Sequence, residues 1–268
     1  STPWVWSFFP QARFMSATHT DKLVMDLSYK ARAVVLSEKY QHYFPHVVLD
    51  REAENYFTNT LGGDRNTCTV GGKTPTGFHA HFLIPDDPLD PQGARSEAEL
   101  ENAARFHTEV IPSRKVDKDV AVMILVMQRL HYRDPTAVVL KIGRMEGAVP
   151  VRLICLPGEL TENVNPPLEE IRLNYANAYA NGLLDEKRLS RRTLNTYKAT
   201  LGSYAYASQV QQQPMPPGGG MFKVEYFNQR VKAAPYHARR IRFWDRAATK
   251  DGGCRTAGVL MAKDDVGN

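Results

Sequence analysis

The stretch HFLIPDDP, residues 81–88, is the part of the sequence that indicates the fold class most directly. It is a short apolar run that ends in two adjacent acidic residues, Asp86 and Asp87, and then in a proline. We interpret the run as a buried strand, because a short apolar run bounded by turn-forming residues is typical of one. In an open α/β sheet, ligands bind at the carboxyl ends of the strands, which is where both carboxylates would lie. Taken alone, the same letters also fit a plain exit from a strand into a turn.

Further strands and helices are predicted on both sides of this stretch. The continuous apolar run 120–127 is typical of a strand that is buried on both faces, and 149–156 repeats the pattern more weakly. Amphipathic helices are predicted from Asp21, which we place at the N-cap, and over 96–110, which opens with a capping box. Additional strands are predicted at 12–18 and 47–49, with a hairpin over 56–70. Buried strands separated by helices imply an α/β fold with a largely parallel, three-layer sheet.

After residue 157 the sequence becomes polar and basic. Two helical segments are predicted, 168–180 and 185–206, and the second contains a basic cluster formed by Lys187, Arg188, Arg191 and Arg192. The next stretch, QQQPMPPGGGMF at 211–222, is half proline and glycine and is typical of a linker. The residues beyond this linker therefore begin a different domain.

The composition is that of a globular protein with a small positive charge. Lys and Arg number 34 against 29 Asp and Glu, which gives a formal net charge of +5 that permits but does not require contact with nucleic acid. The longest apolar run, 120–127, is far shorter than the ~20 residues of a membrane-spanning helix, so we expect no membrane partner. The 3 cysteines form no C-x-x-C pair, which favours a reducing, intracellular compartment. The N-terminus lacks the basic region of a signal peptide.

A second polar motif, MQRLHYRDP at 127–135, follows the apolar run 120–127. At the carboxyl end of a parallel strand, Gln128 and Arg129 would point to the same crevice as Asp86 and Asp87, where polar side chains sense a γ-phosphate. A solvated strand exit is the plain alternative.

A third motif, FWDRAAT at 243–249, ends a predicted strand at Asp245 and is followed by the glycine pair 252–253 and a second strand at 256–261. An aspartate in this place is typical of the first hairpin of a ribonuclease-H-like nuclease. That chemistry needs three or four carboxylates around two metal ions, and only Asp245 stands at such a position. An exposed aspartate at a strand end is the plain alternative.

Together, these motifs resemble the large subunit of tailed-bacteriophage terminases, the motor and nuclease that packages viral DNA. The resemblance covers nearly the whole chain, and its segments correspond in order to the stretch after the Walker A helix, Walker B with its glycine-rich approach, the coupling motif, the linker and the first nuclease hairpin. They are RFMSATHTDKLV (13–24), GGDRNTCTVGGKTPTGFHAHFLIPDDP (62–88), VMQRLHYRDP (126–135), LGSYAYASQVQQQPMPPGGGMFK (201–223) and FWDRAATKDGGCRTAGVLMAKD (243–264).

The resemblance implies a P-loop NTPase-type core over residues 1–165, a helical lid and linker over 166–235, and the start of a ribonuclease-H-like nuclease over 236–268. It implies an ATPase that moves double-stranded DNA into the prohead and a metal-dependent endonuclease that cuts the concatemer. The implied partners are double-stranded DNA, the portal protein and the small terminase subunit. The implied setting is a homo-oligomeric ring on the prohead, in the cytoplasm of the bacterial host.

The resemblance also implies roles for particular residues, with ATP and Mg²⁺ as cofactors. Asp86 would hold magnesium through its coordinated water, and Asp87, in the place usually held by glutamate, would orient the attacking water. Asp245 would bridge the Mg²⁺ or Mn²⁺ ions of the nuclease. The residues implied to lie at the nucleotide are Ser1, Thr2, Gln128 and Arg129, and Arg65 or Arg129 is a candidate phosphate-sensing arginine.

The chain also departs from the terminase pattern. The resemblance places the Walker A glycines and lysine before residue 1 and the other nuclease carboxylates after residue 268, so we expect residues 1–268 to show little activity. Many relatives have a hydrophobic residue in place of Pro85, an arginine in place of Phe78 and an aspartate in place of Cys254, and Pro75 is an insertion. These departures weigh against an efficient ATPase.

Two other interpretations stay open. The chain fits a non-catalytic terminase remnant, for example from a decayed prophage, that binds DNA or a partner through its basic helical segment. It also fits a P-loop helicase or another translocase. That class predicts no nuclease hairpin, so it accounts poorly for residues 243–249.

Overall fold

The computed structural model describes residues 1–72, 77–161, 164, 179–216, 233–245 and 257–263. Contacts between residues divide the chain into two compact units, Ser1–Pro217 and Gly218–Asn268. Each unit is described by itself. The domain boundaries expected after residues 165 and 235 stay predictions.

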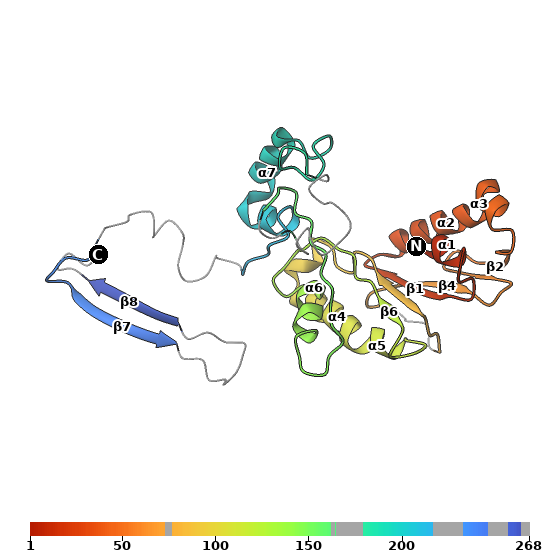
Figure 1. The fold of residues 1–268 in the computed structure, drawn as a ribbon, viewed down its shortest axis with the longest axis horizontal. Helices are drawn as coiled ribbons and strands as arrows, with labels where there is room; N and C mark the ends of the chain where they lie inside the picture. Colours follow the sequence, from red (N-terminus) through yellow and green to blue (C-terminus); the bar gives the residue numbers. More distant parts are fainter. Residues whose placement is uncertain (73–76, 162–163, 165–178, 217–232, 246–256, 264–268) are drawn as a thin grey trace. The chain divides into compact units, whose positions relative to one another are not determined.

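The first unit is built on a 6-stranded mixed sheet in the order β2-β3-β4-β1-β5-β6 (Figure 1). Strand β1 pairs in parallel with β4 and β5, and β5 pairs in parallel with β6. The pairs β2–β3 and β3–β4 are antiparallel. The strands are β1 (Arg13–Thr18), β2 (Leu49–Glu52), β3 (Tyr56–Asn59), β4 (Asp64–Thr69), β5 (Phe82–Pro85) and β6 (Val122–Met123). The predicted α/β fold with a largely parallel sheet is confirmed, as is the hairpin, which β3 and β4 form.

Helices cover both faces of the sheet, because successive side chains of the central strand β1 point to opposite faces. Phe14 packs with Trp6 and Val35 in one core cluster, whereas Met15 packs with Ile111 in another. The helices are α1 (Thr2–Trp6), α2 (Asp21–Leu36), α3 (Glu38–Tyr43), α4 (Glu97–Arg105), α5 (Ile111–Ser113) and α6 (Pro135–Ile142), with a π-helical turn at Phe106–Val110. The helices α1 and α2 therefore lie on one face and α5 on the other, which makes three layers.

The caps of two helices test the sequence analysis directly. Ser96 caps α4 as predicted, because its side chain accepts a hydrogen bond from the backbone N–H of Glu99. The predicted N-cap of α2 was wrong by one position. Thr20 has the extended backbone of a cap and accepts from Leu23 N, so Asp21 is the first residue of the helix.

The prediction of buried strands at 120–127 and 149–156 was wrong. Only Val122–Met123 forms a strand in the first stretch, and alternate side chains there are exposed, up to 69% at Val120. No strand forms over 149–156, which the structure describes in full, and Val149 is 71% exposed. An apolar composition favours an extended chain, but a strand is buried only where other strands and helices pack against it. β6 is the last strand in the order of the sheet, so it has a neighbouring strand on one side only.

The helical segment that follows the sheet is shorter at its start than predicted. Helix α7 spans Arg191–Gln209, and residues 185–190 form turns. Leu194 and Tyr206 from α7 pack with Leu183 in a small core cluster. The predicted helix at 168–180 falls mostly on residues outside the described part of the chain, as does the linker from residue 217 onward.

The second unit contains the predicted hairpin. Strands β7 (Arg239–Asp245) and β8 (Ala257–Lys263) pair antiparallel, with Asp245 opposite Ala257. The predicted glycine turn, 252–253, lies outside the described residues. Among the described helices of the chain, none is long and apolar enough to cross a membrane.

Candidate functional site

The acidic pair lies at the carboxyl end of β5, beside the end of β1. The backbone N–H of Asp86 donates to Ala17 O at 2.8 Å, and that of Asp87 donates to Val126 O at 2.8 Å. The carbonyl of Asp87 accepts from His19 N at 3.2 Å and lies 2.8 Å from His19 Nδ1. These hydrogen bonds hold Asp87 at a φ of +45°, which a residue with a side chain rarely adopts. Backbone hydrogen bonds to the end of β1 and to the segment after β6 therefore fix the direction in which the acidic pair leaves the sheet.

The carboxylate of Asp86 lies in an unfavourable electrostatic setting. Burial raises its pKa, the adjacent Asp87 raises it further, and Arg65 acts in the opposite direction. None of the described residues donates a hydrogen bond to this carboxylate. A cation beside it would relieve the repulsion, so the pair has the chemistry of a metal or phosphate-metal site.

The donor set fits magnesium better than a metal held by protein alone. Within the described residues, no group of three or more His, Cys, Asp and Glu side chains could hold a metal ion. Magnesium commonly uses one or two carboxylates and takes its other ligands from water and substrate phosphates. Asp86 and Asp87 can supply that smaller share.

Arg65 connects the acidic pair to the start of α1. Its guanidinium donates to Thr2 Oγ1 at 2.8 Å, and both residues are buried, with exposed fractions of 5% and 0%. Burial lowers the pKa of Arg65 to about 10, and the attraction of Asp86 works against that change. The Nε atom of Arg65 has no hydrogen-bond partner among the described residues. The structure thus brings Thr2 and Asp86 to one buried arginine, which sequence analysis had considered only as a phosphate sensor.

Ser1 lies at the same place as Thr2 but is exposed. It is the N-cap residue of α1, and its side chain makes no capping hydrogen bond. Ser1 therefore directly precedes the residue whose hydroxyl accepts a hydrogen bond from Arg65.

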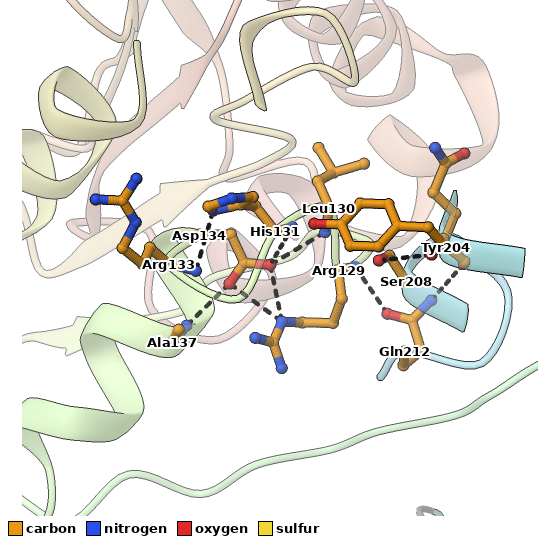
Figure 2. Close-up of polar contacts among 10 residues, drawn as sticks. Arg129, Leu130, His131, Arg133, Asp134, Ala137, Tyr204, Ser208 and Gln212 are labelled. Carbon is orange, nitrogen blue, oxygen red and sulfur yellow. Dashed lines mark hydrogen bonds and ion pairs between the residues drawn. The ribbon is translucent and has the colours of Figure 1, made fainter. Parts of the chain in front are cut away.

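Gln128 and Arg129 lie in a polar loop, residues 127–134, that follows β6. The Nε atom of Arg129 donates to both carboxylate oxygens of Asp134, at 2.9 and 3.1 Å (Figure 2). Asp134 is fully buried and also accepts from the N–H groups of Leu130 and Ala137 at 3.1 and 2.9 Å. Arg129 is therefore tied into its own loop, and no contact in the described structure joins it to the acidic pair.

Sequence analysis missed Asp134 and Gln212. The sequence contains a signal for Asp134, because an aspartate before a proline at the first helical position is typical of an N-cap, and Asp134 does cap α6. No local signal exists for Gln212. It accepts from Arg129 N at 2.9 Å across a separation of 83 residues, and only the tertiary structure brings the two together.

A cavity of about 470 Å³ lies between the polar loop and the helical segment. Its walls include Gln128 from the loop and Tyr197, Thr200 and Gln212 from the helical side, with leucines between them. The predicted site residue Gln128 thus faces this cavity.

The remaining predicted site residue, Asp245, ends β7 in the second unit. It is the only acidic residue among the described residues of that unit, 233–245 and 257–263. The described part of the second unit therefore supplies one carboxylate, fewer than the three or four that a two-metal nuclease needs.

Comparison with known proteins gives a distant similarity for this mostly parallel α/β chain with its acidic pair. No family model matches the sequence. No curated protein matches it either. The structure is similar to the crystal structure of the HK97 bacteriophage large terminase, with 14% sequence identity and a TM-score of 0.48. The match covers 98% of this chain and 53% of that chain, so this chain spans about half the length of the protein it matches.

Proposed function

We propose that this chain carries the ATPase core and the first nuclease hairpin of a large terminase subunit, which drives double-stranded DNA into a prohead. One observation carries the ATPase part of the proposal. Asp86 and Asp87 follow the carboxyl end of β5 in the parallel part of the sheet, and the buried Arg65, whose charge acts on Asp86, donates a hydrogen bond to Thr2 at the start of α1. Two kinds of protein group hold magnesium beside a bound nucleoside triphosphate: a hydroxyl at the start of a helix and a carboxylate at the end of a strand.

The roles of the site residues follow from their chemistry. Asp86 would hold magnesium through a water molecule, and the metal would neutralise charge on the phosphates during the reaction. Asp87 would accept a hydrogen bond from the attacking water and orient it. The short backbone hydrogen bonds on both sides of Asp87 would keep that orientation fixed.

Arg65 would keep the site assembled before nucleotide binds. Its guanidinium holds the Thr2 hydroxyl and offsets the charge of Asp86. A nucleotide and its metal would compete for the same hydroxyl and the same carboxylate. We therefore propose Arg65 as a charge that the metal displaces, in place of the free phosphate sensor that sequence analysis considered.

The test of this proposal needs a phosphate-binding loop, because the 268 residues contain no complete G-x-x-x-x-G-K-[ST] motif. In a chain that carries such a loop ahead of Ser1, Asp87→Asn should bind ATP normally and hydrolyse it at least 100-fold more slowly (about 10²-fold is typical for loss of a general base). Nucleotide affinity and phosphate release would be measured on one preparation. Glu101→Gln, which neutralises an exposed carboxylate on α4, is the matched control. Normal turnover in Asp87→Asn would remove Asp87 from the proposed role.

The nuclease and the packaging assembly are further parts of the proposal. Asp245 would bridge Mg²⁺ or Mn²⁺ ions together with carboxylates that the described residues do not include. The proposed partners are double-stranded DNA, the portal protein and the small terminase subunit, with the protein acting as a ring on the prohead. This work would take place in the cytoplasm of the bacterial host.

The non-catalytic alternative has one supporting observation. The basic cluster at the start of α7 is exposed, and two of its members, Arg188 and Arg191, are paired with Asp185 and Glu159. Lys187 and Arg192 have no such ion pair among the described residues and would be available to phosphates. Binding of this chain to DNA that weakens with salt, with no nucleotide turnover in a chain that has a phosphate loop, would favour this alternative.

A further inference from the structure

We propose that Gln212 is a positioning residue that fastens the polar loop to the C-terminal end of α7. Its side-chain oxygen accepts from Arg129 N at 2.9 Å, and its side-chain nitrogen donates to Gln209 O at 2.7 Å (Figure 2). One carboxamide therefore bridges the loop and the last residue of the helix. Gln212 is partly buried, so water competes poorly for these two hydrogen bonds.

The backbone of Gln212 supports this role. Its φ of +56° lies in the left-handed region, which costs roughly 1 kcal/mol for a residue with a side chain. The neighbours of Gln212 are fixed to the same helix, because Gln211 N donates to Tyr206 O and Gln213 N donates to Ala207 O. The unusual φ is what turns the side chain of Gln212 toward the loop, and the two hydrogen bonds offset its cost.

Hydrogen bonds to one buried side chain hold the loop that Gln212 contacts. The carboxylate of Asp134 accepts from the side chain of Arg129 and from the N–H groups of Leu130 and Ala137. We expect a loop held in this way to move as one piece, so that a displacement at one end reaches the other end. Arg129 is the residue at which this loop meets α7.

The other end of the loop reaches the acidic pair. Asp87 N donates to Val126 O at 2.8 Å, and Val126 directly precedes the polar loop. Hydrogen bonds and three peptide units thus connect Asp87 to Arg129, and Gln212 continues the connection to α7. We infer that a change of position at the acidic pair moves the end of α7, immediately before the proline-rich stretch that starts at Pro214.

The consequence for turnover rests on the proposed ATPase function, but the fastening itself does not. Three consecutive glutamines provide the controls. Gln211 bonds to Glu159 and Tyr206, Gln212 bonds to the loop, and Gln213 is exposed and makes no side-chain hydrogen bond in the described part of the chain. Gln212→Met keeps the length of the side chain and removes both hydrogen bonds. Gln212→Glu keeps the acceptor for Arg129 N.

The first experiment measures amide hydrogen exchange by NMR on the 268-residue chain without nucleotide. In Gln212→Met the Arg129 amide should exchange roughly five- to tenfold faster, which is the change expected for loss of one hydrogen bond. Gln212→Glu should keep the Arg129 amide protected, and Gln213→Met should leave it unchanged. Equal protection in Gln212→Met and the parent chain would overturn the proposal. The proposal would also be overturned if the Arg129 amide lost as much protection in Gln213→Met as in Gln212→Met.

The second experiment tests whether motion passes through Gln212. Asp134→Asn loosens the polar loop while keeping a similar shape, and it should speed exchange at the end of α7, residues 206–210. In the Gln212→Met background, Asp134→Asn should cause no further increase in amide exchange at residues 206–210, because the connection through Gln212 is already lost. Additive effects in the double variant would overturn the inference. Because no nucleotide is used, this outcome is independent of the Asp87→Asn hydrolysis test.

Discussion

Asp134 is a carboxylate with no exposure to water, and its hydrogen bonds explain why the fold tolerates it. It accepts from the side chain of Arg129, from the backbone N–H of Leu130 in the polar loop and from that of Ala137 in the first turn of α6. A buried carboxylate with this many donors is stable only while all of them stay in place. At the scale of single residues, the polar loop therefore depends on Asp134 more than on Arg129, which sequence analysis had singled out.

Asp134→Ala should lower the free energy of unfolding of the first unit by about 3 kcal/mol. The Arg129 side chain is only 17% exposed, and the change leaves its guanidinium without an ion-pair partner. It also removes the cap of α6. Urea denaturation followed by circular dichroism would measure the loss. Asp119→Ala, at an exposed aspartate whose carboxylate makes no contact in the described structure, should cost less than about 0.5 kcal/mol. A similar cost for both variants would contradict this account of the loop.

The stability of the Asp86→Asn variant should increase relative to that of the parent chain as the pH rises. Burial and Asp87 raise the pKa of Asp86 above its ordinary value of 3.8, so between 3.8 and the raised pKa the folded chain binds more protons than the unfolded chain. The contribution of Asp86 to folding stability is thus fully present below pH 3.8, and it is lost as the pH rises through the raised pKa. The difference in Tm between Asp86→Asn and the parent chain should increase in favour of the variant from about pH 3.5 to about pH 7. A difference that does not change with pH would show that Asp86 ionises freely.

Helix α7 shows how one residue shapes a whole element. Gly202 has a φ of +76° and a ψ of 165°, inside what is otherwise a helix from Arg191 to Gln209. Essentially only glycine adopts that combination, so the residue breaks α7 into two segments. The second segment carries Tyr206 into the core cluster with Leu183 and ends beside the polar loop. The direction of the chain at Gln212 is therefore set at Gly202.

Gly202→Ala should destabilise the first unit by roughly 1–3 kcal/mol, the usual cost of a residue held in a glycine-only conformation. A methyl group added at Gly202 would meet no other atom within 4 Å, so the cost would come from the backbone alone. Thermal unfolding and helix content by circular dichroism would be measured together. An increase in helix content with no loss of stability would mean that α7 is straight in solution.

The whole molecule separates its two proposed chemistries into different units. The acidic pair belongs to Ser1–Pro217, and Asp245 belongs to Gly218–Asn268. Different units have different cores, so a substitution in one should leave the activity of the other intact unless the chain misfolds. This separation makes the nuclease proposal testable without disturbing the acidic pair.

Asp245→Ala, in a chain with the phosphate loop and the further nuclease carboxylates, should abolish Mg²⁺- or Mn²⁺-dependent cleavage of plasmid DNA. Loss of one bridging carboxylate leaves the charge of the two metals unbalanced. Phosphate release from ATP should be unchanged in the same preparation. Retained cleavage would refute the role of Asp245, and loss of both activities would indicate misfolding.

Local pattern was enough to predict much of the fold. The strand β5 with its acidic pair, the cap at Ser96, the β3–β4 hairpin and the β7–β8 hairpin follow from short-range rules. The apolar run of β5, the serine before α4 and the alternation of the hairpin strands are each encoded within a few neighbouring positions, even where the strand pairs with a distant one. Short-range sequence was therefore sufficient to place acidic side chains at strand ends.

Which of those side chains lie close together depends on long-range packing. Residues 120–127 read as a buried strand, yet β6 lies at an edge, because burial depends on neighbours that the segment does not encode. The pairing of Arg65 with Thr2 spans 63 residues, and that of Arg129 with Gln212 spans 83. Contacts over such separations depend on how the sheet is ordered and where α7 turns. Local sequence was enough to predict Arg129 as a site residue, but its contacts with Asp134 and Gln212 depend on packing. Packing also places the buried charge of Arg65 near the acidic pair.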